Sequence, residues 1–314
     1  MYYLLLIIGL VTLLFSGDLL VRGGVSLARH FKVSTLVVGM TVVSLGTSAP
    51  ELVVSLQAVF TGHADLAVGT VIGSNISNIG LVLGLTVIIL PIRVNARSAY
   101  FDWPVMMGAT ILLFFFIRNG VLVHYEGMIF FLLLAAFLVY SIMHSRKREG
   151  KNNNKIPLPK YSLAISILIV ALSSVGLRFG ADWLVKGASG VARSFNISEY
   201  VISASVIAFG TSVPELATSM IAAFRKETDI SIGNIIGSNL FNILGILGVT
   251  AAAKNIDVNE QVVRFDIWYL GGISVLLLLM MLPINKSILG RGKGIILVIC
   301  YISYIAIVYS GIIS

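Results

Sequence analysis

Charged residues are scarce in this sequence, and their scarcity excludes the soluble globular proteins. Only 11% of the 314 residues are Asp, Glu, Lys or Arg, while 57% are hydrophobic; soluble domains are usually about 25% charged. The sequence therefore predicts an integral membrane protein. Cysteine is rarer still: the lone Cys300 excludes an internal disulfide and a thiolate metal cluster. The four histidines share no metal-ligand spacing, so we assign them no site.

Long apolar runs dominate what remains. A helix needs about 20 apolar residues to cross roughly 30 Å of hydrocarbon, and the sequence contains ten such runs. They are expected near residues 2–21, 35–60, 66–90, 101–117, 121–143, 162–180, 199–224, 230–252, 266–283 and 294–313. The predicted fold class is therefore all-α, an integral membrane protein with ten transmembrane helices.

The net charge of +8 comes largely from one polar segment. Residues 145–160, SRKREGKNNNKIPLPK, hold six of the basic residues. A solvated cytoplasmic linker explains this run better than a nucleic-acid partner, so we expect no nucleic acid. With the N-terminus outside, the loops after the first, third, fifth, seventh and ninth spans hold 16 of the 22 Lys and Arg. The positive-inside rule then predicts a multi-pass protein of the cytoplasmic (inner) membrane with both termini outside.

The chain is similar to itself at an offset of 164 residues. Ten of 22 positions are identical between 37–58 and 201–222, and ten of 21 between 66–86 and 230–250. Each copy holds five spans, an odd number, so the two copies are expected to be inverted repeats, as in many secondary transporters. We expect a first repeat over 1–144, a cytoplasmic basic linker over 145–160, and a second repeat over 161–314.

The first duplicated motif, GTSxPE, places a carboxylate inside an apolar span in each repeat. The stretches SLGTSAPELVVS and AFGTSVPELATS contain Glu51 and Glu215, and a carboxylate at the bilayer centre costs roughly 2.5–3.5 kcal/mol. Pro50 and its counterpart Pro214 each remove a backbone donor and free carbonyls about four residues earlier. Carbonyls, hydroxyls and carboxylates together form an oxygen cage, which suits a hard cation such as calcium. We therefore predict a cation site.

The second duplicated motif, GSNxxN, adds neutral oxygens. Ser74 and Asn78 are four residues apart and share one face of a helix, as do Ser238 and Asn242. Asn75 and Asn239 lie only partly on these faces. The glycines at 69, 73, 233 and 237 have the small-residue spacing that lets membrane helices approach closely. The offset also pairs Asp18 with Asp182, and each has a basic residue four positions on, so we interpret both as surface ion pairs.

With these motifs in order and each present twice, the whole chain resembles the cation/calcium exchanger superfamily, close to its prokaryotic sodium/calcium exchanger branch. The resemblance implies a secondary active antiporter that exchanges Ca²⁺ for Na⁺ by alternating access. It also implies that the second and seventh helices are broken, and that the first and sixth helices slide over a core of the other eight.

The resemblance further implies a set of ion ligands. Glu51 and Glu215 would be the central ligands of Ca²⁺, and the carbonyls of Thr47 and Thr211 would complete its shell. The flanking Na⁺ sites would use hydroxyls of the two Thr-Ser pairs and of the GSN serines, two backbone carbonyls, and two amides in the middle. Besides the two threonines, these residues are Ser48, Ser212, Ser74, Ser238, Asn78, Asn242, Ser44 and Ala208.

One position departs from the family pattern and leaves the coupling ion open. Many sodium/calcium relatives have Asp where this chain has Asn242, so the site carries two formal negative charges, which Ca²⁺, two Na⁺ or two protons would each neutralise. The Thr-Ser pairs favour Na⁺, because a dehydrated sodium ion needs oxygen ligands and a proton does not. The proton-coupled branch of the family typically has Asn in place of that Thr, and the missing Asp also argues against K⁺ co-transport.

Two alternatives to sodium-coupled exchange are a Ca²⁺/H⁺ antiporter and, more remotely, a passive cation channel. The inverted repeat favours alternating access over a pore. We expect no enzyme, since the sequence shows no Ser/His, paired-Asp or HExxH arrangement. We also expect no cofactor and no protein partner, only the transported ions Ca²⁺ and Na⁺ and the lipid bilayer, and a monomer.

Overall fold

The computed structural model describes the chain except residues 62–64, 152–157, 196–201, 203–207, 283–287 and 311–314. The described part is helical apart from four two-residue strands. Nine of its helices are long and apolar enough to cross a membrane, and Val213–Phe224 is a shorter apolar helix. The predicted all-α membrane fold is therefore confirmed. The span predicted over 199–224 lies partly outside the described residues.

The first half of the chain forms five membrane-length helical units. They are α1 (Tyr2–Phe31); α2 (Thr35–Val38), η1 (Gly39–Val43) and α3 (Ser44–Phe60); α4 (Asp65–Ser77), η2 (Asn78–Leu83) and α5 (Gly84–Ile89); η3 (Ser98–Asp102) and α6 (Trp103–Ile117); and α7 (His124–Lys151). The η segments are π-helical. Two short strands, β1 (Ile92–Arg93) and β2 (Val121–Leu122), follow α5 and α6.

The second half repeats this order of elements. They are α8 (Leu163–Ser194); α10 (Ala208–Gly210) and α11 (Val213–Phe224); α12 (Thr228–Leu240), η5 (Phe241–Leu247) and α13 (Gly248–Ala253); β3 (Ile256–Asp257); η6 (Val262–Asp266) and α14 (Ile267–Met281); β4 (Ile288–Leu289); and α15 (Arg291–Tyr309). The bounds of η3 and α6 recur in η6 and α14 after 164 residues, so the duplication read from the sequence extends to the positions of the π-helical turns.

The strands connect the two halves by exchange. β1 pairs antiparallel with β4, and β2 pairs antiparallel with β3. Since β3 lies 164 residues after β1, each strand of one repeat pairs with a strand of the other. The loops after the third and ninth helical units therefore meet on one face, and those after the fourth and eighth meet on another.

Further contacts gather the remaining odd-numbered loops on the first of these faces. Arg146, after the fifth unit, donates from Nε to the carbonyl of Phe31, after the first, at 3.1 Å. Thr35, Arg93 and Lys226, from the loops after the first, third and seventh units, line one hollow. The loops that the positive-inside count assigned to one side thus share one face of the molecule, which we call the linker face.

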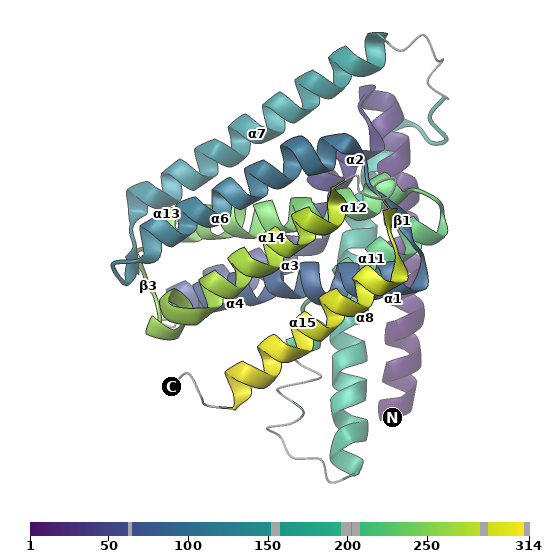
Figure 1. The fold of residues 1–314 in the computed structure, drawn as a ribbon. Coiled ribbons are helices and arrows are strands. Elements are labelled where there is room, and N and C mark those ends of the chain that lie inside the picture. The colour runs from purple at the N-terminus through teal and green to yellow at the C-terminus, as the bar shows by residue number, and fades with distance from the viewer. Residues whose placement is uncertain (62–64, 152–157, 196–201, 203–207, 283–287, 311–314) are drawn as a thin grey trace.

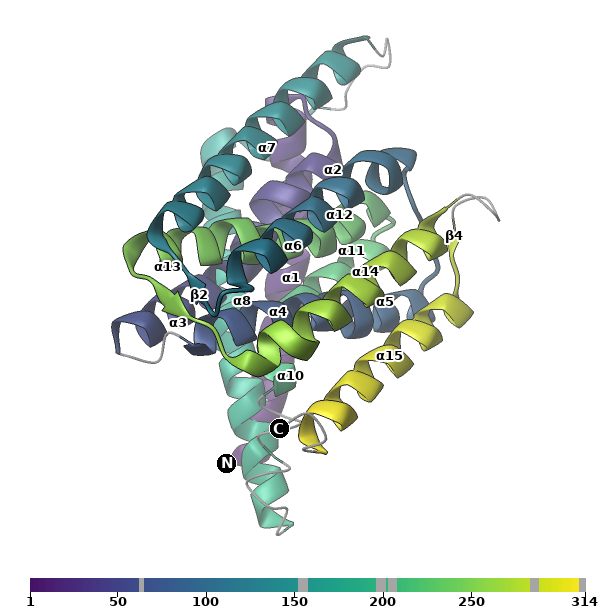
Figure 2. The ribbon, with the colours of Figure 1, turned by 60° about the vertical axis from the view of Figure 1, so that its left-hand side comes forward.

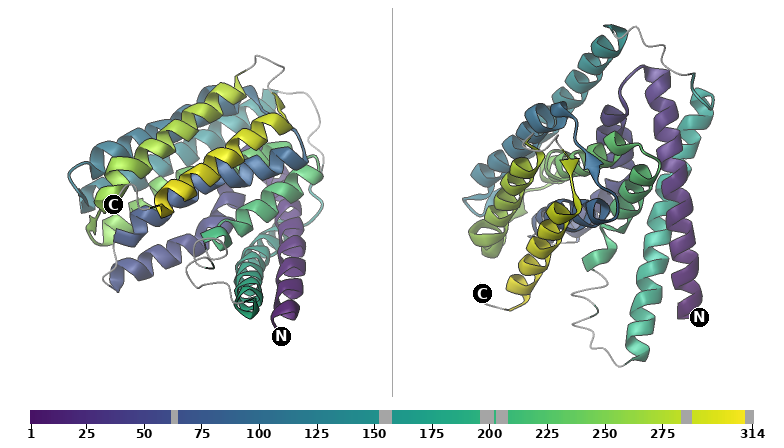
Figure 3. Two further views of the ribbon diagram at one scale, coloured as in Figure 1. Left: turned by 60° about the horizontal axis from the view of Figure 1, so that its bottom comes forward. Right: turned by 45° about the vertical axis from the view of Figure 1, so that its right-hand side comes forward.

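α1 and α8 form a long antiparallel pair that lies beside the remaining helices, as Figure 3 shows on its right. The other helices cross the direction of this pair obliquely (Figure 2). Glycines set the close approach: a Cβ on Gly9 would lie 2.5 Å from the backbone nitrogen of Leu184, and one on Gly23 would lie 3.0 Å from the Ile169 side chain. Smooth contact of this kind suits two helices that pack by shape rather than by apolar transfer.

The first and sixth helices are longer than the sequence predicted. Spans were expected over 2–21 and 162–180, whereas α1 continues to Phe31 and α8 to Ser194. An apolar-run criterion stops at the charged residues near Asp18 and Asp182, but the helices continue because each half packs against the other helix of the pair. α7 likewise runs to Lys151, so the start of the predicted linker 145–160 is helical; residues 152–157 lie outside the described part.

The second span also differs from its expected break near Gly46. The chain is helical from Thr35 to Phe60, straight through Pro50, and its irregularity is the π-helical turn η1. Pro50 removes one backbone hydrogen bond, and a packed membrane helix tolerates that loss. At the corresponding motif of the second repeat, the helix is interrupted: α10 ends at Gly210 and α11 begins at Val213, with a turn between them.

The two halves meet where α12 lies against the second helical unit. A Cβ on Gly237 would lie 2.6 Å from both the Cα and the carbonyl oxygen of Met40, and one on Gly233 would lie 2.6 Å from the Leu36 carbonyl. The predicted close approach is thus found for these two glycines. For Gly69 and Gly73 no described atom lies within 4 Å of such a Cβ, and residues 201 and 203–204, which the repeat places opposite them, are outside the described ranges.

We expect Gly237→Ala to destabilise the protein strongly. Its methyl group overlaps backbone atoms of Met40 that cannot move without separating the two halves, and overpacking of this kind costs about 1–3 kcal/mol. Gly108→Ala, on an exposed face of α6 with no described atom within 4 Å of its Cβ, is the matched control. Thermal unfolding in detergent should show a lowered midpoint for Gly237→Ala alone; equal midpoints would contradict the contact.

Candidate functional site

Two carboxylates lie buried on helices from opposite halves of the chain. Glu51 on α3 is 6% exposed and Glu215 on α11 is 1% exposed. The Oε2 atom of each has no hydrogen-bond partner among the described residues. Ser48 on α3 donates from Oγ to Glu215 Oε1 at 3.1 Å, across 167 residues of sequence. The GTSxPE motifs of the two repeats are therefore in direct contact, and each contributes an oxygen that is free to bind a cation.

Thr47 lies at the centre of a second set of oxygens. Its Oγ1 is 3.2 Å from the carbonyl of Ser44 and 3.5 Å from Ser238 Oγ on α12. It is also 3.3 Å from Oδ1 of Asn234, which donates in turn to Ser219 at 3.0 Å. Thr47, Ser44 and Ser238, which the resemblance assigned to the ion sites, are brought together here.

The four motif asparagines form a reciprocal hydrogen-bond network between α4–η2 and α12–η5. Asn78 donates to Asn239 Oδ1 at 3.1 Å, and Asn242 donates to Asn75 Oδ1 at 2.9 Å. Asn75 also donates to the Asn239 carbonyl at 3.2 Å. Each bond has its counterpart in the other repeat. Oδ1 of Asn242 is buried and has no partner in the described part of the chain, so one amide oxygen remains available.

The second repeat presents its Thr-Ser pair differently. Thr211 is exposed, whereas Ser212 is buried with an Oγ that lacks a described partner. Both line a cavity of about 310 Å³, together with Ser74 and Ser77 of α4. Ala208 is the first residue of α10. The candidate ligands of the second repeat therefore border an open cavity, while those of the first are enclosed.

Three residues near this site were not singled out in the sequence. Asn234 is fully buried and joins Thr47 to Ser219; its signal was an amide four residues before Ser238. Ser77 has a buried, unpartnered hydroxyl. Arg178, at the middle of α8, carries a positive charge that acts on Glu51. A basic residue at the centre of a long apolar helix was the signal, and its repeat counterpart is a leucine, Leu14.

The chemistry of this site is that of oxygen ligands. Within the described ranges, no three His, Cys, Asp or Glu side chains come together. A cation here would thus be held by two carboxylates together with neutral hydroxyl, amide and carbonyl oxygens, a set that suits hard ions. The acidic pair at residues 18 and 182 lies apart from it: Asp18 pairs with Arg22 at 2.8 Å and with Arg225, and Asp182 pairs with Lys186 at 2.7 Å.

A multi-pass helical protein that buries two carboxylates among hydroxyls and amides has the architecture of an ion-transporting membrane protein. Comparison with known proteins agrees. The sequence profile of the sodium/calcium exchanger protein family matches residues 1–143 and 165–310. The chain belongs to this family.

Relatives align over nearly the whole chain. The putative antiporter CaxA of Alkalimonas amylolytica is 35% identical over 97% of each chain. The sodium/calcium exchanger MaX1 of Methanosarcina acetivorans is 28% identical over 98% of each chain. The solved structure of the sodium/calcium exchanger from Methanococcus jannaschii is 31% identical over 97% of each chain, with a TM-score of 0.82.

Proposed function

We propose that this protein is a secondary active antiporter that exchanges Ca²⁺ for Na⁺ by alternating access. The observation that carries the proposal is the contact between the two GTSxPE motifs, with Glu51 and Glu215 buried and each left with an unpartnered carboxylate oxygen. Burying a carboxylate without a counter-charge is costly, so a site of this kind is adapted to a bound cation. The sodium/calcium exchangers to which the chain is similar supply the ion pair.

Each group has a distinct role in this proposal. Glu51 and Glu215 bind Ca²⁺ from two sides, and the carbonyls of Thr47 and Thr211 complete the shell. The hydroxyls of both Thr-Ser pairs and of Ser74 and Ser238, with the Ser44 and Ala208 carbonyls, bind Na⁺ beside the carboxylates. Asn78 and Asn242 lie in the middle and fix the separation of the halves through their amide network.

Inverted repeats explain the arrangement of the elements. If the second repeat enters the membrane from the opposite side, equivalent segments exchange contacts across a central axis, as the strand pairs and the asparagine network do. In such proteins access alternates when one group of helices moves against the other. The α1–α8 pair is the moving group in this proposal, because it packs through glycines beside the remaining helices (Figure 1).

The same reasoning supports an orientation. The linker face carries the basic segment 145–160, so we place it in the cytoplasm and both termini outside, in the cytoplasmic membrane. Repeats over 1–144 and 161–314 then cross the membrane in opposite senses. Since both halves of the site come from one chain, a single copy suffices for exchange.

Charge does not select the counter-ion, but ligand number does. Asn at both 78 and 242 leaves two carboxylates, which two Na⁺ or two protons would equally neutralise. Sodium needs several oxygen ligands once it is dehydrated, and Thr47, Ser48, Ser212 and Ser238 lie around the carboxylates to supply them. Protons would leave these hydroxyls without a use. We therefore favour Na⁺.

Calcium uptake into proteoliposomes loaded with Na⁺ tests this choice. At clamped pH we expect ⁴⁵Ca²⁺ uptake to require an outward Na⁺ gradient and to stop when Na⁺ is replaced by choline on both sides. A pH gradient alone should drive no uptake. Uptake that ignores Na⁺ but follows the pH gradient would replace our proposal with Ca²⁺/H⁺ exchange, and uptake that saturates with neither gradient would indicate a channel.

A further inference from the structure

A second charged hollow lies on the linker face, beside α1. Its volume is about 270 Å³, and its polar lining consists of Arg22, Ser26, Arg29, Lys160, Arg225 and Glu227. We call it the basic hollow. Arg22, Ser26 and Arg29 form one stripe of α1, Arg225 and Glu227 belong to the turn after α11, and Lys160 belongs to the segment that leads into α8.

Positive charge is in surplus there. Four lining residues are cationic, and two carboxylates oppose them: Glu227 in the lining and Asp18, which pairs with Arg22 at 2.8 Å and with Arg225. Four minus two leaves two uncompensated positive charges. Nε of Arg22 is buried without a partner in the described chain. Arg29 donates to the carbonyl of Leu158 at 3.2 Å, and its charge acts on Glu227. The basic hollow therefore has spare donors for an anion.

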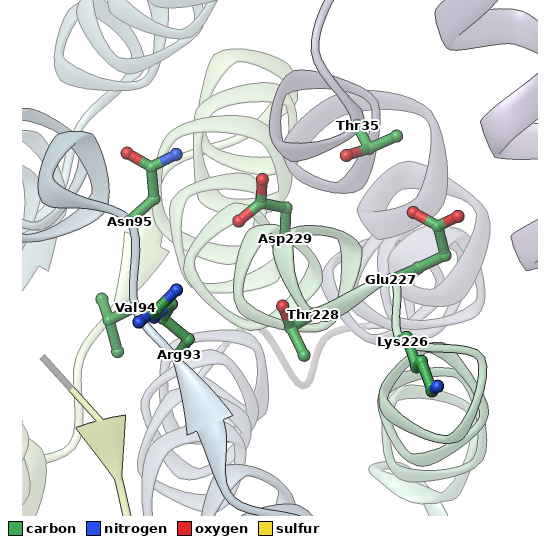
Figure 4. Close-up of a pocket in the computed structure, with 8 residues that line it drawn as sticks. All are labelled: Thr35, Arg93, Val94, Asn95, Lys226, Glu227, Thr228 and Asp229. Atoms are coloured by element: carbon green, nitrogen blue, oxygen red, sulfur yellow. The ribbon is translucent and has the colours of Figure 1, made fainter. Parts of the chain in front are cut away.

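The neighbouring hollow shows that this surplus is local. It has a volume of about 320 Å³, and two cations, Arg93 and Lys226, line it with two carboxylates, Glu227 and Asp229 (Figure 4). Its charges balance. The surplus is also confined to one repeat, because Arg225 and Glu227 correspond in sequence to Thr61 and His63. A chain built twice has thus made a basic hollow once, on the face that carries the basic linker.

Apolar surface suited to acyl chains adjoins the basic hollow. Ser166 of α8 donates to Ser26 at 2.8 Å, so the first turns of α8 lie next to the hollow. On these turns Leu163 and Ile167 are 41% and 52% exposed. On α1, the run of exposed apolar residues ends near Phe15, before Arg22 begins the basic stripe. The basic hollow thus lies at the depth where headgroups meet hydrocarbon.

We propose that the basic hollow binds the phosphate headgroup of an anionic phospholipid from the leaflet on the linker side, with the acyl chains along the start of α8. Basic pockets between membrane helices on the cytoplasmic side bind such headgroups. The phosphate would accept from the free donor of Arg22 and from Arg29 and Lys160. Because the hollow lies between α1 and the turn after α11, the bound lipid would contact both the α1–α8 pair and the rest of the protein.

Native mass spectrometry of the purified full chain tests the proposal. The protein is offered phosphatidylglycerol and phosphatidylcholine with the same acyl chains, and the ratio of their dissociation constants is measured. We expect the wild type to prefer phosphatidylglycerol. Arg29→Gln with Lys160→Gln, which leaves both partners of Asp18 in place, should weaken that preference about 25-fold, or about fivefold for each cation removed.

Three comparisons make the result decisive. Arg29→Lys with Lys160→Arg keeps both charges and should keep the preference. Lys186→Gln with Arg193→Gln removes two cations from the corresponding end of α8 and should leave the preference intact. Excess inorganic phosphate should not displace the lipid. No preference in the wild type, an equal loss in the α8 control, loss in the charge-keeping variant, or displacement by phosphate alone would each overturn the proposal, whichever ions the protein exchanges.

Discussion

Glu51→Gln and Glu215→Gln are each expected to abolish Ca²⁺ exchange while the protein remains folded. Glutamine has nearly the same shape as glutamate, and at position 215 its Oε1 can still accept from Ser48. A divalent ion that faces one carboxylate instead of two keeps an uncompensated buried charge, which costs on the order of 3–5 kcal/mol. Uptake of ⁴⁵Ca²⁺ by the reconstituted variants should therefore fall about 100-fold or more, and their thermal midpoints should be no lower than that of the wild type.

The matched control is a carboxylate outside the site. Asp182→Asn removes a surface ion pair with Lys186 and should leave exchange near normal. Asp18, its repeat counterpart, serves less well, because it also binds Arg225 and so joins α1 to the end of α11. Near-normal exchange by either glutamine variant would remove Glu51 and Glu215 from the ion site, whatever the control shows.

A disulfide between α8 and α3 is expected to stop exchange completely and reversibly. A Cβ on Gly46 would lie 3.6 Å from the Cβ of Ser174, within the range of about 3.5–4.5 Å that a disulfide spans. Gly46→Cys with Ser174→Cys, in a chain whose Cys300 is replaced by serine, would thus tie the moving pair to the rest of the protein. Oxidation should abolish ⁴⁵Ca²⁺ exchange, and reduction should restore it to the level of the unoxidised variant.

A second disulfide within the moving pair tests the direction of the movement. A Cβ on Gly23 would lie 3.5 Å from the Cβ of Ile169, so Gly23→Cys with Ile169→Cys links α1 to α8. If the two helices move together, its oxidation should leave exchange nearly unchanged. Equal inhibition by both disulfides would mean that α1 and α8 move relative to each other. Full exchange with the first disulfide closed would refute movement of this pair against α3.

The repeats are less equivalent in three dimensions than in sequence, and the difference concerns the site. Thr47 is enclosed and contacts Asn234, whereas Thr211 is exposed and borders a cavity. The counterpart of Asn234 in the first repeat is Thr70, which lines that same cavity. An exchanger that opens to one side at a time needs such inequality in any single state, since one half of the site must be closed while the other is accessible.

The sequence by itself determined the class of protein, the repeats and the carboxylates. Apolar runs longer than the bilayer requires have no stable alternative to membrane helices. A glutamate is retained within such a run only where something compensates its charge. Because both signals depend on composition and order alone, the all-α membrane fold and family membership were predicted and then confirmed. The roles of the individual ion ligands stay predictions.

Tertiary structure decided what depends on partners far away in the chain. The second halves of α1 and α8 read as polar, yet they are helical because each helix packs against the other through glycines. Pro50 predicted a break that neighbouring helices suppress. The basic hollow combines one stripe of α1 with a turn about 200 residues later, and no periodicity records that pairing. Sequence fixes what a residue can do, but only packing chooses its neighbours, since contact energies act between surfaces that the fold has to bring together first.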